Sequence, residues 1–382
     1  MKVLLVSDLH FGVQLPHAKL SVDRRTSDRL KDVAAVGASI LELAESEGAS
    51  AIFVLGDLFD KAAPAMETIR VVAETLKSWA SESRPVFVMP GNHDAYDKAG
   101  AKTTLELFRT LDLPNIHIMD GGKVATFDEV VFWALPWVPY VCVSQIVAGF
   151  PVEEDTVDVC LIHQTVDGCV DGKRSLSSPL KESALDAFDV VFSGHIHQPQ
   201  RIGRVQYLGS PLQLRFGDDG KRGVYTFDLD ELAVEFHPLT SPVFFARDIT
   251  AGQDLDEIED ALLEFLPPEG SQDAPCEVYV RLRVKGERED VDAEMKTLAE
   301  LKQWFASEGG IARKWLTTRV YTDDGVSERI RELVSKKKVA DTETLVSAYT
   351  AACKPPSDLA GGTIAPDVLA KAGMEFLSLG AK

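Results

Sequence analysis

The first half of the chain alternates short apolar runs with sharp polar turns. Five runs consist mainly of β-branched and other apolar residues: Val3–Val6, Ala51–Leu55, Pro85–Met89, Val157–Ile162 and Val190–Phe192. Such uninterrupted runs are typical of strands that are buried on both faces. Between the first three runs, Asp28–Glu47 and Ala65–Ala80 carry apolar residues at helical spacing. The alternation predicts an α/β fold whose sheets are covered by helices.

The pattern changes after residue 200 to short strands separated by glycine turns. These strands are expected at Val205–Leu208, Gly223–Asp228 and Leu232–Phe236, as for the second sheet of a sandwich. The predicted fold class is therefore α/β in the form of an α+β sandwich, with a two-sheet core flanked by helices. We assign this core to residues 1–239.

A smaller α+β module is expected over residues 240–325, because the chain is longer than a typical single domain. Its predicted elements are three strands and one amphipathic helix: Phe244–Ile249, Glu277–Val284, Lys314–Tyr321 and Val291–Ser307. Residues 326–382 are expected to form helices at Ser327–Lys337, Asp341–Cys353 and Pro366–Phe376.

Composition and charge narrow the class of protein. The five cysteines are scattered without a Cys-x-x-Cys pair, which argues against a disulfide framework and indicates a reducing compartment. The amino-terminal apolar run is too short for a signal peptide, and no run approaches the roughly 18 apolar residues of a transmembrane helix. We therefore expect a cytoplasmic protein without membrane association. The net charge of −20 disfavours a passive DNA-coating protein but not an enzyme that holds phosphate through metal ions.

Each apolar run is followed by side chains that can bind a metal ion. The predicted ligands are Asp8, His10, Asp57, Asn92, His163, His195 and His197. We expect them to converge, because loops at the carboxyl ends of strands in α/β sheets meet at one place. The spacing of Asp8 and His10 would put both on one side of an extended backbone. Gly56, Gly91 and Gly194 each precede a ligand, where the chain must turn sharply and pass close to its neighbours.

The types of ligand indicate the chemistry. Carboxylate, amide and imidazole groups without a thiolate suit Mn²⁺, Mg²⁺, Fe²⁺ or Zn²⁺. Seven ligands are too many for one ion and suit two ions about 3.5–4 Å apart, which clamp a phosphate and activate a shared water. We expect His93 to protonate the departing alkoxide and Asp94 to orient its ring.

Each motif also has a plain structural explanation, because a single Asp-x-His or Gly-Asp sequence is commoner as a turn than as a site. The segments Gly91–Asp94 and Gly194–His197 are more specific, since paired polar residues after an apolar run rarely serve packing. Five of the chain's eight histidines fall within these motifs. Their order and shared context favour the metal site.

In this order the motifs resemble the calcineurin-like metallophosphoesterase superfamily. A closer resemblance is to the SbcD-type DNA repair nucleases of bacteria and phages, over roughly residues 1–235. The segments that carry it are Ser7–Gly12, Leu135–Trp137, Gly194–Gln200 and Tyr207–Gln213, with Phe216–Asp218 and Lys221–Val224 after them.

The resemblance implies a metallophosphoesterase core with a capping domain, two Mn²⁺ ions and Asp57 as the bridging ligand. It implies manganese-dependent 3′–5′ exonuclease and endonuclease activity in DNA repair, inside a bacterial cell or phage-infected host. The implied partners are DNA, an SbcC-type coiled-coil ATPase, and a second copy of the chain in a homodimer. The carboxy-terminal helices are candidates for docking the ATPase, and ordinary packing of their apolar faces is the alternative. Archaeal and eukaryotic relatives have histidine at the position of Asp60, so a role there in positioning DNA is not carried over. Orienting His93 or a loop is the alternative.

Two basic clusters are candidates for contact with DNA phosphates, and a solvated surface is the alternative explanation. The first contains Arg24 and Arg25 with Arg29 and Lys31, and the second contains Arg201, Arg204 and Arg215 with Lys221 and Arg222.

Three functions remain open at this point. The chain could be the nuclease subunit of an SbcC–SbcD-like complex, a small-molecule phosphodiesterase or phosphatase of the same superfamily, or a structural subunit that tethers DNA ends. The Gly209-Ser210-Pro211 segment and the extra module count against the second function. The complete ligand set disfavours the third.

Overall fold

A computed structural model describes most of the first 251 residues and parts of the remainder. The described residues are 1–14, 27–96, 102–138, 140–152, 155–218, 220–251, 260, 278–286, 290–291, 295–296, 298–299 and 314–321. Two compact units divide the chain, one made of Met1–Arg247, Asp254–Leu282 and Glu300–Thr317, the other of Asp248–Gln253, Arg283–Ala299 and Thr318–Lys382. The helices predicted after residue 326, and most of Val291–Ser307, lie outside the described residues. The boundaries after residues 239 and 325 stay predictions.

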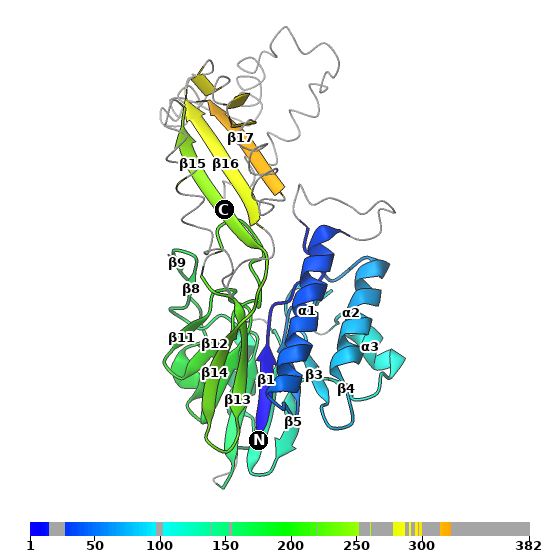
Figure 1. Cartoon of the computed structure of the whole chain (residues 1–382). Helices are drawn as coiled ribbons and strands as arrows, with labels where there is room; N and C mark the ends of the chain where they lie inside the picture. Colours follow the sequence, from blue (N-terminus) through cyan, green and yellow to red (C-terminus); the bar gives the residue numbers. More distant parts are fainter. Residues whose placement is uncertain are drawn as a thin grey trace. The chain divides into compact units, whose positions relative to one another are not determined.

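The first sheet of the larger unit has six strands in the order β14-β13-β1-β2-β3-β4 (Figure 1). Their bounds are β1 Lys2–Val6, β2 Ile52–Leu55, β3 Val86–Met89, β4 Ile116–Ile118, β13 Gly223–Asp228 and β14 Ala233–Pro238. Strands β1 to β4 run parallel, while β13 pairs antiparallel with β1 and β14 antiparallel with β13. Assigning β13 and β14 to the second sheet is therefore wrong. They cover the open edge of β1, and the apolar pattern of a strand does not specify which edge it joins.

The second sheet also has six strands, in the order β11-β12-β10-β7-β6-β5. Their bounds are β5 Gly122–Phe127, β6 Val130–Leu135, β7 Val157–Ile162, β10 Val190–Ser193, β11 Gln200–Ile202 and β12 Val205–Tyr207. The four central strands run parallel, and β5 and β11 are antiparallel edges. A small ribbon of β8 (Val170–Asp171) and β9 (Arg174–Ser175) and the 3-10 helix η1 (Glu182–Leu185) lie between β7 and β10 in the chain.

Helices cover the outer faces of the two sheets. The helix α1 (Asp28–Ser46) begins where the side chain of Ser27 accepts a hydrogen bond from the Leu30 amide at 3.1 Å. It packs beside α2 (Met66–Trp79), whose Trp79 indole donates to the carbonyl of Gly37 at 2.8 Å. The short α3 (Glu106–Leu111) precedes β4, and α4 (Tyr140–Ala148) packs on the second sheet through Val143 and Val147.

The core explains why the strands read as continuous apolar runs. Along β1, Val3 and Leu5 pack between the two sheets, whereas Leu4 and Val6 pack toward α1 and α2. Each central strand is buried on both faces in this way, as expected for covered parallel sheets. The order of layers is helix, sheet, sheet, helix. The predicted fold class, a two-sheet α/β core flanked by helices, is confirmed.

A separate three-stranded sheet has the order β15-β16-β17, with bounds Val243–Thr250, Val278–Gly286 and Lys314–Tyr321. The three strands predicted at these positions are confirmed. In β16, Arg283 and Lys285 both pair with the Asp248 carboxylate of β15, each at 2.5 Å. Of the helices in the described ranges, none has the length and apolarity needed to cross a membrane.

Candidate metal centre

The seven predicted ligands lie together at the carboxyl ends of strands from both sheets. Asp8 and His10 follow β1, Asp57 follows β2 and Asn92 follows β3 in the first sheet, while His163 follows β7 and His195 and His197 follow β10 in the second. Parallel strands deliver their carboxyl ends to one edge, and the two sheets present the same edge. The centre therefore spans the sandwich.

One group of ligands consists of Asp8, His10 and His197, whose potential ligand atoms all lie within 4.8 Å of one another. The Nε2 atoms of His10 and His197 are 3.1 Å apart, and Nε2 of His197 is 4.0 Å from Oδ1 of Asp8. Two imidazole nitrogens that face each other at this distance are both satisfied by one cation between them.

A second group consists of Asp57, His163 and His195, completed by Asn92. The amide oxygen of Asn92 lies 2.7 Å from Nδ1 of His195 and 3.3 Å from Nε2 of His163. Nδ1 of His163 donates to the carbonyl of Leu55 at 2.7 Å. This hydrogen bond orients the ring and directs Nε2 into the centre, as is usual for a metal-binding histidine.

Asp57 connects the two groups. Its Oδ2 lies 3.6 Å from Nε2 of His10 in the first group and 3.3 Å from Nε2 of His163 in the second. Its other oxygen, Oδ1, accepts a hydrogen bond from the His93 amide at 2.8 Å. A carboxylate that faces both groups supports the prediction that Asp57 bridges two ions.

Four of the seven ligands have left-handed backbone conformations: φ is 54° at Asp8, 48° at His10, 49° at Asp57 and 80° at His195. The extended backbone predicted for Asp8 and His10 is therefore wrong. Their amides donate instead to the carbonyls of Gly56 and Asp57, at 3.1 and 3.0 Å. The loops after β1 and β2 hold each other in this strained conformation, which is a common feature of functional sites.

Three glycines make room for the ligands, as predicted. A Cβ atom on Gly56, whose φ is 90°, would lie 2.6 Å from Cγ of His163. A Cβ atom on Gly91 would meet the carboxyl group of Asp57, and one on Gly194 would lie 2.8 Å from Nδ1 of His163. Contacts this short do not occur between real side chains, so the ligands can pack as they do only against glycine.

His93 lies exposed at the edge of the centre, with its ring centroid 4.7 Å from that of His10. Its Nδ1 donates to the backbone carbonyl of Asp60 at 2.7 Å. The carboxylate of Asp60 faces His10 instead, with Oδ1 3.5 Å from Nδ1. Asp60 thus orients His93 through its main chain, which supports the second of the two roles considered for this position.

Asp94 does not make the predicted contact with the ring of His93. Its carboxylate is fully buried and accepts hydrogen bonds from the amides of Phe59 and Gly91, each at 2.9 Å, and of Leu58 at 3.3 Å. It therefore fastens the loop after β2 to the loop after β3. Burial, reinforced by the charge of Asp57, raises the pKa of Asp94 to about 7.

The charges inside the centre are strongly coupled. Burial opposes ionisation of Asp57 and protonation of His163, but their attraction outweighs it. It holds the pKa of Asp57 below its ordinary value and raises the pKa of His163 to about 9. Burial and the charge of His163 lower the pKa of His195 to about 3, and burial with the neighbouring His10 lowers the pKa of His197. The metal-free centre thus carries compensating charges.

Two residues support the ligands in ways that the sequence does not predict. The hydroxyl of Ser7 donates to Asp8 at 2.5 Å and lies 2.9 Å from the Leu55 carbonyl. The guanidinium of buried Arg222 donates to the carbonyl of His197. Both residues fall within the motifs that resemble the SbcD-type nucleases. Their place in these motifs is the one feature of the sequence that could have indicated a supporting role.

The basic residues proposed for DNA contact have different surroundings. Arg24 and Arg25 lie outside the described residues, and Arg29 is buried, so it cannot reach a DNA phosphate. Arg201 is exposed on β11, and Arg204 pairs with Glu182 and Asp186. Arg215 lines a hollow of about 350 Å³ that also includes His197. Contact with DNA stays a prediction for the residues of the two clusters other than Arg29.

The model of the calcineurin-like phosphoesterase family matches residues 1–199 of this chain. The chain belongs to this family. It is accordingly a metal-dependent phosphoesterase, whose histidine and aspartate clusters form a centre of the dimetal type.

Several solved structures are similar to this chain. An archaeal phosphodiesterase is 13% identical, and the match covers 63% of this chain and 100% of that one with a TM-score of 0.35. The phosphoesterase Yfce from E. coli is 16% identical, with coverage of 61% and 96% and a TM-score of 0.30. A dimetal phosphatase from Danio rerio is 10% identical, with coverage of 59% and 91% and a TM-score of 0.38.

The donor set fits a pair of hard or borderline divalent ions. Oxygen and imidazole nitrogen donors suit Mn²⁺, Mg²⁺, Fe²⁺ or Zn²⁺. A cation would satisfy the two Nε2 atoms of His10 and His197, which face each other. A cation would likewise be bound by Oδ2 of Asp57, which faces His10 and His163. Asp8, His10 and His197 would hold one ion, and Asn92, His163 and His195 the other.

Proposed function

We propose that this protein is a phosphodiesterase that hydrolyses its substrate at the dimetal centre. The position of Asp57 carries this proposal, because its Oδ2 faces a ligand group on either side. When bound, two divalent ions supply the Lewis acidity that polarises a phosphate and lowers the pKa of an attacking water. Manganese is our choice among the fitting metals, on the resemblance to the SbcD-type nucleases.

His93 is proposed to hold the proton that the departing alkoxide receives. Nδ1 is occupied by the Asp60 carbonyl, so Nε2 is the nitrogen that can present a proton to the leaving oxygen. Asp57 accepts from the amide of His93 and therefore positions the proposed acid as well as the ions. Asp94 is a positioning residue, because it holds the two loops that carry Asp57 and His93.

Small phosphodiesters are the substrate class that we favour, because they need nothing beyond the centre itself. DNA is the second candidate. Its support is the segment Tyr207–Gln213, shared with the SbcD-type nucleases, in which the Ser210 amide donates to the His197 carbonyl at 3.1 Å. This segment is thus attached to a proposed ligand.

The test uses the purified full-length chain with Mn²⁺ and three substrates: bis(p-nitrophenyl) phosphate, a cyclic nucleotide and duplex DNA. Asp57→Ala should lower kcat on any substrate that turns over by more than about 100-fold. His93→Leu should lower kcat by about 10²–10⁴-fold while Mn²⁺ binding is retained. Glu74→Ala, which removes a carboxylate that is 63% exposed on α2, is the control and should leave kcat unchanged.

The substrates separate the candidates. Turnover of small phosphodiesters without cleavage of DNA supports the favoured class, and efficient cleavage of DNA ends supports the second. Activity in Asp57→Ala equal to that of Glu74→Ala would show that the centre has been wrongly assigned.

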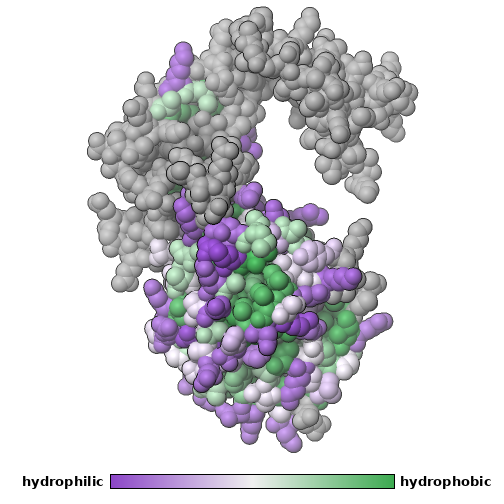
Figure 2. Space-filling view, turned by 90° about the vertical axis from the view of Figure 1, so that its right-hand side faces the viewer, coloured by the Kyte–Doolittle hydropathy of each residue, from purple (hydrophilic) through white to green (hydrophobic). Residues whose placement is uncertain are grey.

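The partners remain proposals that belong with the DNA candidate. The face of α2 and α3 in Figure 2 carries an apolar patch among hydrophilic residues, and Met66, Leu107 and Leu111 on these helices are 79%, 37% and 51% exposed. This face supports a homodimer, which light scattering of the purified chain can test. Co-purification with a coiled-coil ATPase tests the second partner. Repair activity that survives loss of a metal ligand would favour the tethering role.

A further inference from the structure

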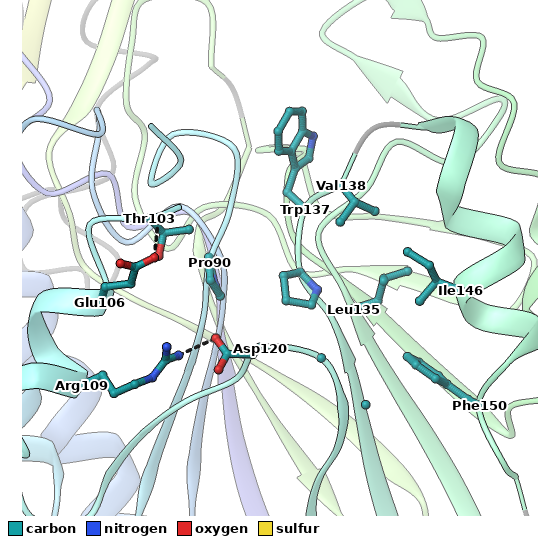
Figure 3. Close-up of a pocket in the computed structure, with 13 residues that line it drawn as sticks. Pro90, Thr103, Glu106, Arg109, Asp120, Leu135, Trp137, Val138, Ile146 and Phe150 are labelled. Atoms are coloured by element: carbon teal, nitrogen blue, oxygen red, sulfur yellow. Dashed lines mark hydrogen bonds and ion pairs between the residues drawn. The ribbon is translucent and has the colours of Figure 1, made fainter. Parts of the chain in front are cut away.

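Figure 3 shows a pocket of about 420 Å³, here called the Trp137 pocket, whose lining includes Pro90, Leu135 and Trp137. One wall is apolar and contains Trp137, Val138, Ile146 and Phe150. The opposite wall is polar and is built from α3 and the turn before β5. All of its lining residues belong to the larger unit. Neither the ligand set nor the proposed acid uses this pocket.

The Trp137 pocket and the metal centre share their supporting backbone. The Trp137 amide donates to the carbonyl of Pro90 at 3.3 Å, and Pro90 lies two residues before Asn92. The carbonyl of Leu135 accepts from the His163 amide at 3.3 Å. The pocket therefore lies at the strand ends that position two proposed ligands, Asn92 and His163.

The apolar wall suits a flat aromatic group. Phe150 is held in place by ring contacts with Trp133, at 5.4 Å between centroids, and with Phe188, at 6.1 Å. Trp137 and Val138 are only half-buried, and Ile146 is 36% exposed. In Figure 3 these apolar side chains stand on one side of the pocket, across from the polar ones.

The polar wall presents both donors and acceptors. The guanidinium of Arg109 pairs with Asp120 at 2.5 Å, and the carboxylate of Glu106 accepts from the Thr103 amide at 3.4 Å. Figure 3 marks both interactions. Arg109 and Asp120 remain about half or more exposed, at 49% and 66%, so they can hydrogen-bond to a ligand.

We propose that the Trp137 pocket binds the base of a nucleotide whose phosphodiester lies at the metal centre. A nucleobase has apolar faces, which stack on aromatic side chains, and a polar edge with donors and acceptors. The two walls match these two features, and the volume is within the range of ligand sites. The inference rests on the proposed function and narrows its substrate class to nucleotides.

The first test measures binding without metal or turnover. Saturation-transfer NMR with adenosine as the probe, and ribose as the reference, is applied to the full-length chain. Adenine protons should receive saturation in the wild type and in Trp137→Phe, and should lose it in Trp137→Ala. Ile146→Glu changes the same apolar wall at a residue of α4, and the adenine protons should also receive no saturation from this variant. The control, Leu111→Ala, changes an exposed residue on α3 outside the pocket and should behave as the wild type. Absence of transfer to the wild type, or equal transfer to Trp137→Ala, would overturn the inference.

The second test compares kcat/KM for a dinucleotide with kcat/KM for analogues in which tetrahydrofuran replaces one base or the other. At the preferred position, kcat/KM for the intact dinucleotide should exceed kcat/KM for the analogue without that base by about ten- to a hundredfold in the wild type. In Trp137→Ala this ratio should fall toward one. A ratio of one in the wild type would contradict the proposal that the pocket binds a base, while the proposed phosphodiesterase function would stand. If the wild type cleaves no phosphodiester at all, the proposed function fails and the binding test alone decides the pocket.

Discussion

At the scale of residues, the metal centre depends on positions where a side chain is missing. Gly56, Gly91 and Gly194 lie against His163 and Asp57, in gaps too small for a methyl group. The left-handed backbone at Asp8 and Asp57 adds strain that the surrounding hydrogen bonds must hold. The ligands are therefore sensitive to substitutions that touch no ligand atom.

Gly194→Ala should destabilise the protein by about 1–3 kcal/mol and weaken Mn²⁺ binding, because its Cβ would collide with Ser7, Leu55 and His163. Urea unfolding and a Mn²⁺ titration measure the two effects. Gly149→Ala is the control, since its nearest atom would be 3.3 Å away on the surface at the end of α4, and it should change the free energy of unfolding by less than about 0.5 kcal/mol. Equal behaviour of the two variants would contradict the packing argument.

Mn²⁺ affinity should rise with pH up to about 9 and then level off. The raised pKa of His163, about 9, means that the metal-free protein holds a proton that a metal ion must displace. In the metal-free protein this proton contributes stability below the unfolded pKa of about 6.5, and the contribution is lost as pH rises through 9. Calorimetric titrations in buffers of different ionisation enthalpy should detect about one released proton per site at pH 7 and almost none above pH 10. Affinity that does not change over this range would contradict the prediction.

The sequence predicts which side chains come together at the centre, but it does not predict their local conformation. Apolar runs that end in Asp, Asn or His can be recognised in the amino-acid sequence alone. The left-handed turns at Asp8 and His10 are set by hydrogen bonds to the loop after β2, at Gly56 and Asp57, which lie nearly 50 residues later in the chain. The role of Asp94 was missed for the same reason, because the amides it accepts from lie on two different loops.

At the scale of elements, the positions of the strands were easier to predict than the neighbouring strands with which they pair. Central strands such as β7 and β10 are apolar on both sides because both faces are covered. The fully buried strand β6 is not among the predicted strands, although Val130–Leu135 has the same apolar pattern. β13 and β14 were placed in the wrong sheet, since edge pairing depends on where the chain returns in space rather than on local periodicity.

The packing of α2 on α1 can be tested through Trp79, which is fully buried and donates to the Gly37 carbonyl. Trp79→Ala should lower the free energy of unfolding by about 3–5 kcal/mol, because it leaves a large cavity and removes the hydrogen bond of the indole. Met66→Ala, at a position 79% exposed on the same helix, should cost less than about 0.5 kcal/mol. Urea unfolding distinguishes them, and a small effect of Trp79→Ala would mean that α2 contributes little to the core.

At the scale of the whole molecule, the centre joins the two sheets, because its ligands come from both. Metal binding should therefore stabilise the sandwich as a unit. At 100 times the dissociation constant, Mn²⁺ should add about 2.7 kcal/mol and raise Tm by several degrees. Calorimetric scans with Mn²⁺ and with a chelator measure this difference. Asp57→Ala should show a much smaller shift, and an unchanged Tm in the wild type would argue against a centre shared by both sheets.

The pairing of β1 with β13 also has a consequence for how the protein is made. Lys2 lies opposite Asp228, so β1 can pair with β13 only after more than 200 further residues have been synthesised. At synthesis rates of about 5–20 residues per second, this delay is roughly 10–45 s. Asp8 and His10, directly after β1, also wait for His197, which follows β10. A growing chain thus carries part of each ligand group long before it carries the rest, and the hydrolytic centre is completed only when the sandwich closes.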